Sequence, residues 1–123
     1  MAIVLPDGIL GNNGLEYVRQ YILNNADIVA IIDCPVESFL PSTDTKTSLL
    51  ILKKKKREGL PQTFDTFMAI AKTCGHDRRG KEIYVRDENG DPVIVNGNAV
   101  IDNDFAEITR RLVEHVKTRN IYN

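Results

Sequence analysis

Two clusters of cationic side chains are the residues of this sequence best suited to bind another molecule. The first is the run at positions 53–57, and the second comprises Arg78, Arg79 and Lys81. Lysine and arginine neutralise the phosphates of nucleic acids, and salt weakens such binding because it opposes counterion release. Glycines flank the second cluster, so its guanidinium groups stand on a loop from which they can reach a phosphate backbone. The run at 53–57 follows an apolar segment and is equally typical of a solvated strand end.

The loop at positions 41–47 is a further candidate site, because hydroxyl groups and one ammonium group are concentrated in it. Its polar members are Thr43, Thr45, Lys46 and Thr47. If this loop lies beside the carboxyl ends of parallel strands, its side chains face the edge where α/β sheets bind ligands. The same hydroxyls could instead satisfy amides of the turn itself.

Other patterns point away from common cofactor and metal sites. Glycines at positions 8, 11 and 14 follow an apolar segment, but their spacing differs from the GxGxxG of dinucleotide-binding proteins. Cys74 and His76 lack further cysteine or histidine neighbours in the sequence, so we expect no metal site. Cys34 has no visible activating base, and we expect it to pack at a strand end rather than to act as a nucleophile.

The composition indicates one soluble domain. The chain has 123 residues, of which 42% are hydrophobic, and a net charge of -1. This is enough for one core, and we expect a single domain over residues 1–123. The two cysteines are far apart and no signal-like start precedes them, so we expect reduced thiols in the cytoplasm. The apolar segments are shorter than the roughly 20 residues of a membrane helix, so we expect no contact with a membrane.

The positioning elements follow from the periodicity of apolar residues. Short apolar runs predict strands at 2–5, 28–32, 48–52 and 64–71. Helical spacing predicts one helix at 14–25 and another from about residue 104 onward. Each helix is preceded by the spacing of a capping box, which pairs Asn13 with Glu16 and Asp104 with Glu107.

The connections between these elements predict the sheet topology. The first strand, the first helix and the second strand form a βαβ unit, whose two strands should be parallel. The third strand follows a short link, so we expect it to pair antiparallel. Residues 82–86 and 92–95 flank Asn89-Gly90 and predict a hairpin, because both turn residues tolerate positive φ.

Several motifs resemble one protein family in their order and spacing. They are the strand ending in LPDG at 5–8, the strand ending in Asp33-Cys34-Pro35, Phe39, TKTSLL at 45–50, CGHDRRGK at 74–81 and the helix start NDF at 103–105. Over nearly the whole chain, this succession resembles the later part of the catalytic domain of adenine-specific DNA methyltransferases. These enzymes are the modification subunits of type I restriction-modification systems.

The resemblance implies an α/β fold, namely a partial Rossmann-like methyltransferase sheet with a strand-helix-strand unit plus an antiparallel strand. We expect this sheet in residues 1–73, a loop and hairpin extension in 74–100, and a C-terminal helix in 101–123. If the strands that precede LPDG in the family are missing, the first strand has an unpaired edge. Such an edge favours self-association.

The resemblance also implies a function that this chain cannot perform alone. The family transfers a methyl group from S-adenosylmethionine to adenine in DNA and holds the flipped base with an Asn-Pro-Pro-aromatic motif. Neither that motif nor the Gly-rich F-x-G-x-G motif of cofactor binding occurs in this sequence. We therefore expect a fragment without catalytic or cofactor-binding residues, and the implied partners are DNA and the specificity and restriction subunits.

Candidate DNA-binding residues are Lys46, Thr47, Lys53, Lys54, Arg78, Arg79 and Lys81. Two alternatives to a methyltransferase fragment stay open. A non-enzymatic module could use the same sheet to bind DNA or to assemble subunits. A small nucleotide-binding regulator is the third possibility, and it would be stabilised by a dinucleotide.

Overall fold

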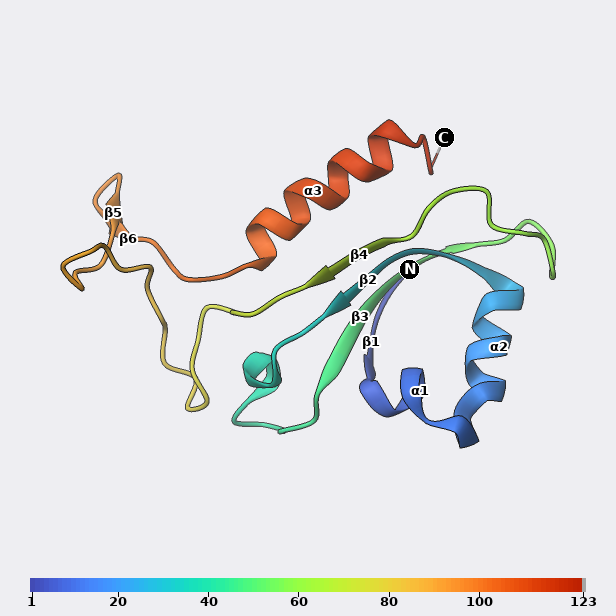
Figure 1. Ribbon diagram of the computed structural model, residues 1–123, viewed down its shortest axis with the longest axis horizontal. Helices are drawn as coiled ribbons and strands as arrows, with labels where there is room; N and C mark the ends of the chain where they lie inside the picture. Colours follow the sequence, from blue (N-terminus) through green and yellow to red (C-terminus); the bar gives the residue numbers. More distant parts are fainter. Residues whose placement is uncertain (123) are drawn as a thin grey trace.

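The chain folds around a four-stranded mixed sheet. In this computed structural model, which describes residues 1–122, the strands are β1 (Ala2–Pro6), β2 (Ala26–Asp33), β3 (Thr47–Lys54) and β4 (Phe67–Ile70). Their order across the sheet is β1-β3-β2-β4 (Figure 1). The helices are α1 (Asp7–Gly11), α2 (Glu16–Asn25) and α3 (Phe105–Thr118), and the 3-10 turns are η1 (Asn13–Leu15) and η2 (Val36–Phe39). A small hairpin of β5 (Ile94–Val95) and β6 (Asn98–Ala99) lies apart from the sheet.

The strand directions confirm the predicted α/β topology. β3 is antiparallel to both β1 and β2, so β1 and β2 run in the same direction with β3 between them. β4 continues the sheet parallel to β2. The registers pair Pro6 with Thr47 and Ser48 with Asp33. The ends of β1 and β2 therefore meet the beginning of β3 at one edge of the sheet.

Each face of the sheet is covered over only part of its width. α3 packs over β2 and β4, where Ile32, Ala71 and Ile108 form a buried cluster. The helices α1 and α2 lie on the opposite side of the sheet from α3 (Figure 1). The β2–β4 register sets Met68 beside Ile31, on the face away from that cluster. Met68 is 70% exposed and Ile70 is 71% exposed. Two large apolar side chains of β4 thus face outward, and such exposed patches commonly mark contact surfaces.

Neither predicted capping box forms, although Asp104 is the N-cap residue of α3 as predicted. Asn12, not Asn13, caps the first helical segment, because its Oδ1 accepts a hydrogen bond from the Gly14 amide at 2.8 Å. Asp104 stands at the start of α3, but its carboxylate accepts from the Lys72 amide at 2.7 Å and the Thr73 amide at 3.2 Å. These tertiary hydrogen bonds compete with local capping. They fasten the end of β4 to the start of α3.

Two predicted elements form only in part. Of the predicted strand at 64–71, only the residues of β4 form a strand. Before β4, the Ile28 amide of β2 donates to Gln62 Oε1 at 2.8 Å, so a side chain takes the place of a strand-to-strand hydrogen bond. The predicted hairpin at 82–86 and 92–95 forms in part: Arg86 and Pro92 make an antiparallel bridge, and the Val93 amide donates to the Val85 carbonyl at 2.8 Å. A second hairpin, of β5 and β6, turns at Asn96-Gly97, whose φ angles of 51° and 80° are both positive. The second Asn-Gly pair has the same turn chemistry as the first.

Candidate functional site

Four polar side chains meet where β1 and β2 end and β3 begins. Ser48 donates its hydroxyl hydrogen to Asp7 Oδ1 at 2.9 Å. The Lys46 ammonium group forms an ion pair with Asp33 and lies 3.9 Å from Asp7 Oδ2. We call these residues the strand-end cluster: Asp7, Asp33, Lys46 and Ser48. The cluster connects the ends of β1 and β2 with the start of β3, which carry the LPDG, Asp33-Cys34-Pro35 and TKTSLL motifs. Both of its carboxylates have a partner within the chain.

Backbone hydrogen bonds hold the strand-end cluster in place. The Asp7 amide donates to the Lys46 carbonyl at 3.0 Å, and the Cys34 amide donates to the Thr47 carbonyl at 3.1 Å. Pro6 and Pro35, which lack an amide hydrogen, mark the ends of β1 and β2. The loops that follow β1 and β2 therefore begin at the same edge of the sheet.

A shallow hollow of about 370 Å³ opens beside this cluster. We call it the threonine hollow, and its lining is Val4, Pro6, Phe39, Thr43, Thr45 and Thr47. The Phe39 ring is 41% exposed. The Thr47 hydroxyl is buried and lacks a hydrogen-bond partner among residues 1–122. An exposed ring beside hydroxyl groups can stack on a planar ligand and bond to its polar edge.

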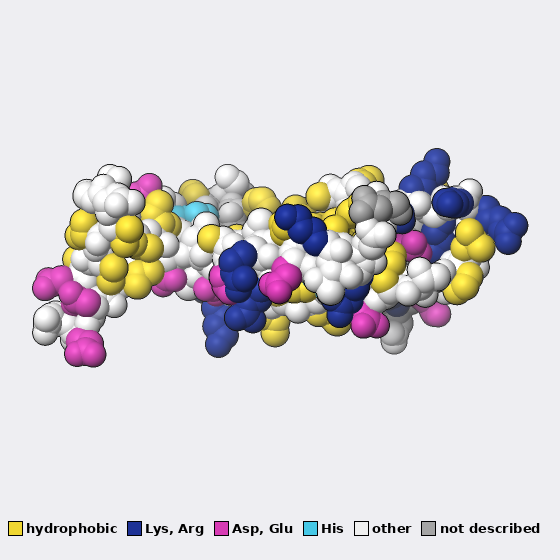
Figure 2. All heavy atoms as spheres, turned by 90° about the horizontal axis from the view of Figure 1, so that it is seen from above, with side chains coloured by type: hydrophobic (Ala, Val, Ile, Leu, Met, Phe, Trp, Pro, Cys, Tyr) yellow, Lys and Arg dark blue, Asp and Glu magenta, His cyan; other side chains and the backbone are white. Residues whose placement is uncertain are grey.

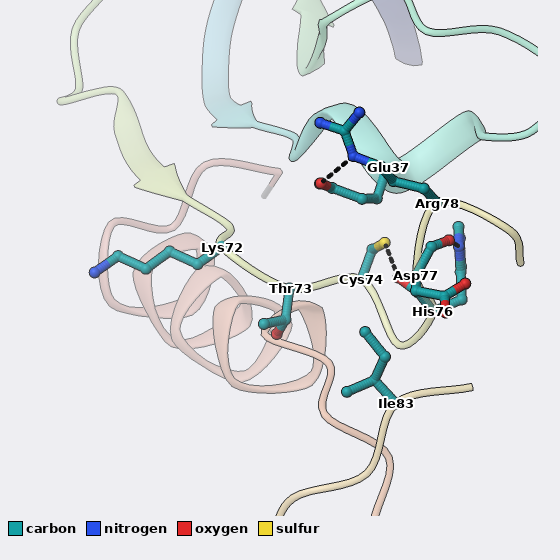
Figure 3. A pocket seen from close by; sticks show the side chains of 8 residues that line it. All are labelled: Glu37, Lys72, Thr73, Cys74, His76, Asp77, Arg78 and Ile83. Carbon is teal, nitrogen blue, oxygen red and sulfur yellow. Dashed lines mark hydrogen bonds and ion pairs between the residues drawn. The ribbon is translucent and has the colours of Figure 1, made fainter. Parts of the chain in front are cut away.

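The predicted basic loop packs against one wall of this region. Arg78 Nε lies 3.9 Å from Glu37 Oε1 of η2, and Figure 3 shows the two side chains next to each other in the lining of a pocket of about 240 Å³. A side chain added at Gly80 would approach Pro41 to 3.8 Å. The basic loop, residues 77–81, is thus a neighbour of the segment that carries Phe39.

Asp77 fixes the shape of the basic loop. Its Oδ1 accepts hydrogen bonds from the amides of Arg79 at 2.8 Å and Lys81 at 3.0 Å. These backbone hydrogen bonds lower the pKa of Asp77. Gly80 has a φ of 85°, which side chains with a Cβ rarely adopt. The exposed side chains of Arg79 and Lys81 therefore extend from an ordered turn.

A second turn repeats this architecture with the opposite charge. Asp87 Oδ1 accepts from the amides of Asn89 at 2.9 Å and Asp91 at 3.0 Å, and Gly90 has a φ of 81°. We call residues 87–91 the acidic turn, with the sequence DENGD against DRRGK in the basic loop. One backbone shape therefore presents both cationic and anionic groups.

The lysines at the end of β3 lie away from this region. Lys53 Nζ donates to the Ile121 carbonyl at 2.6 Å, and Lys55 Nζ donates to the Leu23 carbonyl at 2.7 Å. Lys54, Lys56 and Arg57 are exposed. Figure 2 shows Lys and Arg side chains gathered at the end of the molecule where Figure 1 has the β3–β4 connection. The sequence-predicted residues thus fall into two groups at opposite ends of β3.

The environments of the two cysteines differ. Cys34 is buried at the end of β2, and burial raises the pKa of its thiol above the ordinary value of 9.0. Cys74 is half-buried at the pocket of Figure 3, and its Sγ lies 3.6 Å from the His76 carbonyl. Burial and a raised pKa both oppose thiolate formation at Cys34, which fits the predicted packing role.

Thiol alkylation checks this difference. At pH 8 we expect iodoacetamide to modify Cys74 at least about tenfold faster than Cys34, because the thiolate reacts and Cys34 is shielded. A time course with peptide mapping by mass spectrometry measures both rates, and in urea the two rates should converge. Folding also raises the pKa of Cys34. The protonated thiol therefore contributes to the free energy of unfolding below pH 9, and this contribution is lost as the pH rises further. Equal rates in the native chain would contradict the assignment.

The fold and the strand-end motifs together invite comparison with known families. A family model described as N-6 DNA Methylase matches residues 1–119. The chain belongs to the N-6 DNA methylase family. A search of curated proteins found no significant match. N-6 DNA methylases act on DNA and use S-adenosylmethionine as the methyl donor.

In this N-6 DNA methylase chain, the ends of β1 and β2 do not have the features of a nucleoside-binding site. The segment after β1 closes into α1 instead of a Gly-rich loop, and Asp7 and Asp33 are engaged by Ser48 and Lys46. A ribose-binding site needs an acidic group available for hydroxyls. Within residues 1–122 no three His, Cys, Asp or Glu side chains gather as a metal site would require, and none of the helices has the length and apolarity to cross a bilayer.

Proposed function

We propose that this chain supplies the base-holding and phosphate-contacting part of a DNA adenine methyltransferase from a type I restriction-modification system. The observation that carries the proposal is the threonine hollow, with its exposed Phe39 ring, beside the basic loop. A segment with the Gly-rich motif binds S-adenosylmethionine, and a segment with the Asn-Pro-Pro-aromatic motif holds the adenine together with this hollow. The assembled enzyme acts in the cytoplasm with specificity and restriction subunits.

The hollow suits a flipped adenine in both shape and chemistry. Enzymes that modify a base rotate it out of the duplex and stack it against aromatic side chains. Phe39 offers such a ring, and the hydroxyls of the exposed Thr43 and Thr45 can bond to the polar edge of the base. The hydroxyl of the exposed Thr45 is accessible to a base, whereas that of Thr47 is buried beside the Cys34 thiol and shapes the wall of the hollow.

The basic loop suits the phosphates that flank such a base. Arg79 and Lys81 are exposed, and the Asp77 carboxylate orders the backbone that carries them. Phosphate contacts fix the position of DNA on a protein, whereas contacts to the base fix its identity. Arg78 can exchange Glu37 for a phosphate, because its side chain is 76% exposed.

A methylation assay tests the proposal. We expect the purified 123-residue chain to produce no N6-methyladenine in DNA that contains adenine. Methylation should appear when a polypeptide with the two missing motifs is added and co-purifies with the chain. Methylation by the chain alone would refute the proposed division of the site.

Phe39→Ala should impair the reconstituted enzyme. Stacking of a base on an aromatic ring contributes about 1–3 kcal/mol, so we expect kcat/KM to fall by roughly 5-fold to 150-fold. Phe39→Tyr is the matched control, because it keeps the ring and should keep most of the activity. If both variants behave like the unsubstituted chain, Phe39 does not hold the base.

A second candidate function is a non-enzymatic module that binds DNA or assembles subunits, and the exposed Lys54, Lys56 and Arg57 favour it. Duplex binding at low salt, compared with a control protein of like charge, separates the two. If the chain binds no better than that control, this candidate loses its support.

We also propose that β1 mediates self-association. In the part of the chain that the structure describes, β1 pairs only with β3, so one of its edges is open, and Val4 is exposed on it. Light scattering at about 100 μM, a concentration chosen from typical affinities, should show species larger than a monomer. A stable monomer at that concentration contradicts the prediction.

A further inference from the structure

We propose that the open edge of β4 binds an extended segment of a partner protein, which adds a fifth strand to the sheet. Among residues 1–122, β4 pairs only with β2 and ends the sheet on that side. The proposal concerns assembly with another protein and is independent of methyl transfer.

The register of β4 shows which backbone groups face outward. The Ala71 amide donates to the Asp33 carbonyl of β2 at 2.9 Å. Because the two sides of a strand alternate, the amides and carbonyls of Met68 and Ile70 point away from β2. The next outward amide, that of Lys72, donates to Asp104 at 2.7 Å. The edge therefore presents two consecutive outward positions, and Asp104 closes it at one end.

The side chains of β4 do not prevent another strand from pairing with this edge. Edge strands are commonly protected from pairing by lysine, proline or a bulge. The sequence of β4 is Phe-Met-Ala-Ile, without charge or proline. In β1, by contrast, Pro6 interrupts the hydrogen-bonding edge. β4 is thus the sheet edge better suited to accept another strand.

Two hollows flank the same edge on opposite faces of the sheet. One, of about 320 Å³, lies toward α3, and its polar lining is Asp104, Glu107 and Arg111. The other, of about 430 Å³, lies on the opposite face, and its apolar lining includes Ile31, Met68 and Ile70. Successive side chains of an added strand point to opposite faces, so they would enter the two hollows alternately. In strand addition, backbone hydrogen bonds provide affinity and such hollows provide specificity.

The linings define the chemistry of the partner segment. The hollow with Ile31, Met68 and Ile70 requires an apolar side chain. In the hollow beside α3, Glu107 is paired with Arg110 and Arg111. Asp104, whose Oδ2 accepts from the Lys72 and Thr73 amides, is therefore the carboxylate that a basic side chain would complement. A partner segment that alternates apolar and basic residues therefore fits both faces. A second copy of β4 fits less well, because it would bring Phe67 and Ala69 to the charged hollow.

A labelled peptide tests this site. The probe is a fluorescein-labelled octapeptide in which valine and lysine alternate, and fluorescence anisotropy with the full chain measures binding. We expect a dissociation constant below about 100 μM. Amide hydrogen exchange measured by NMR should slow at Met68 and Ile70 when the peptide is added. The amides of β1 should not change.

Substitutions at one position separate the backbone from the side chain. Ile70→Pro removes the outward amide without removing a hydrogen bond to β2, and proline is tolerated on edge strands. Ile70→Ala keeps that amide and removes most of the side chain. We expect at least about tenfold weaker binding for the proline variant than for the alanine variant.

Several results would overturn the proposal. They are absence of binding up to about 1 mM, equal affinity of the two variants, and protection of β1 amides in place of β4 amides. Protection of Met68 and Ile70 without peptide, together with a doubled mass in sedimentation, would assign the edge to a second copy. If Ile70→Pro does not fold, the exchange rates of the unsubstituted chain decide alone.

Discussion

Replacing the cationic side chains of the basic loop with those of the acidic turn should abolish specific contact with DNA phosphates and leave the fold unchanged. The variant carries Arg78→Glu, Arg79→Asn and Lys81→Asp. The loop then has the sequence DENGD of the acidic turn. Asp77 and Gly80, which shape the turn, are kept. Each lost phosphate contact lowers the salt slope of binding by about 0.9. We expect the slope to fall by roughly 3 and the affinity to fall by at least about 100-fold at low salt.

Fluorescence anisotropy with a labelled duplex at several salt concentrations measures this effect. The matched control is Lys54→Glu, Lys56→Asn and Arg57→Asp, which changes the charge by the same amount at the other end of β3. It should weaken binding only through the general field of the protein. If the control variant loses as much affinity as the loop variant, the basic loop is not the phosphate site.

The second large effect is expected in the core of the sheet. Leu50 lies in the middle of β3, between Ile3 of β1 and Ile31 of β2, and is 1% exposed. Leu50→Ala removes buried methyl groups and leaves a cavity that flanking strands cannot close. Such changes lower the free energy of unfolding by about 2–5 kcal/mol. In a small domain this is a large part of the total stability.

Urea unfolding followed by circular dichroism measures the loss. Leu23→Ala is the control, since Leu23 is 47% exposed on α2 and its replacement should change stability by less than about 1 kcal/mol. The threonine hollow and the basic loop depend on the sheet, so DNA binding should weaken in parallel for Leu50→Ala near its transition. A loss below about 1 kcal/mol would mean that β3 is not the centre of the core.

The sheet was predictable from sequence because each strand is a short apolar run. The run around Leu50 and that around Ile31 are continuous and β-branched or leucine-rich, which fits strands with neighbours on both sides. The short link before β3 correctly indicated an antiparallel strand. Its insertion between β1 and β2 depends on long-range pairing, which local patterns do not encode.

Local signals failed where tertiary contacts compete with them. Asp104 has the spacing of a helix cap, yet its carboxylate binds amides at the end of β4. The Asn89-Gly90 pair turns only an antiparallel bridge, whereas Asn96-Gly97, which was not predicted, turns the hairpin of β5 and β6. In both places the local sequence is compatible with more than one hydrogen-bonding arrangement, and tertiary packing determines which one forms.

The candidate site was predictable in its residue types but not in its geometry. Thr47 and Arg78 were recognised as polar groups near a strand edge and on a Gly-flanked loop. The ion pair of Lys46 with Asp33 was not, because it joins residues from different loops. Phe39 belonged to a motif but not to the predicted site. The signal that could have placed it is an aromatic residue shortly after a strand that ends in Pro35.

The central claim is that the threonine hollow holds a base while the basic loop holds the phosphates next to it. Amide NMR of the isotope-labelled chain, titrated with a short thymine oligonucleotide containing one adenine, tests this most directly. We predict shift changes at Phe39, Thr45 and Thr47 and at Arg79 and Lys81. With an abasic site in place of the adenine, only the changes at Arg79 and Lys81 should remain. Changes confined to residues 53–57, or an unchanged hollow with the adenine present, would contradict the claim.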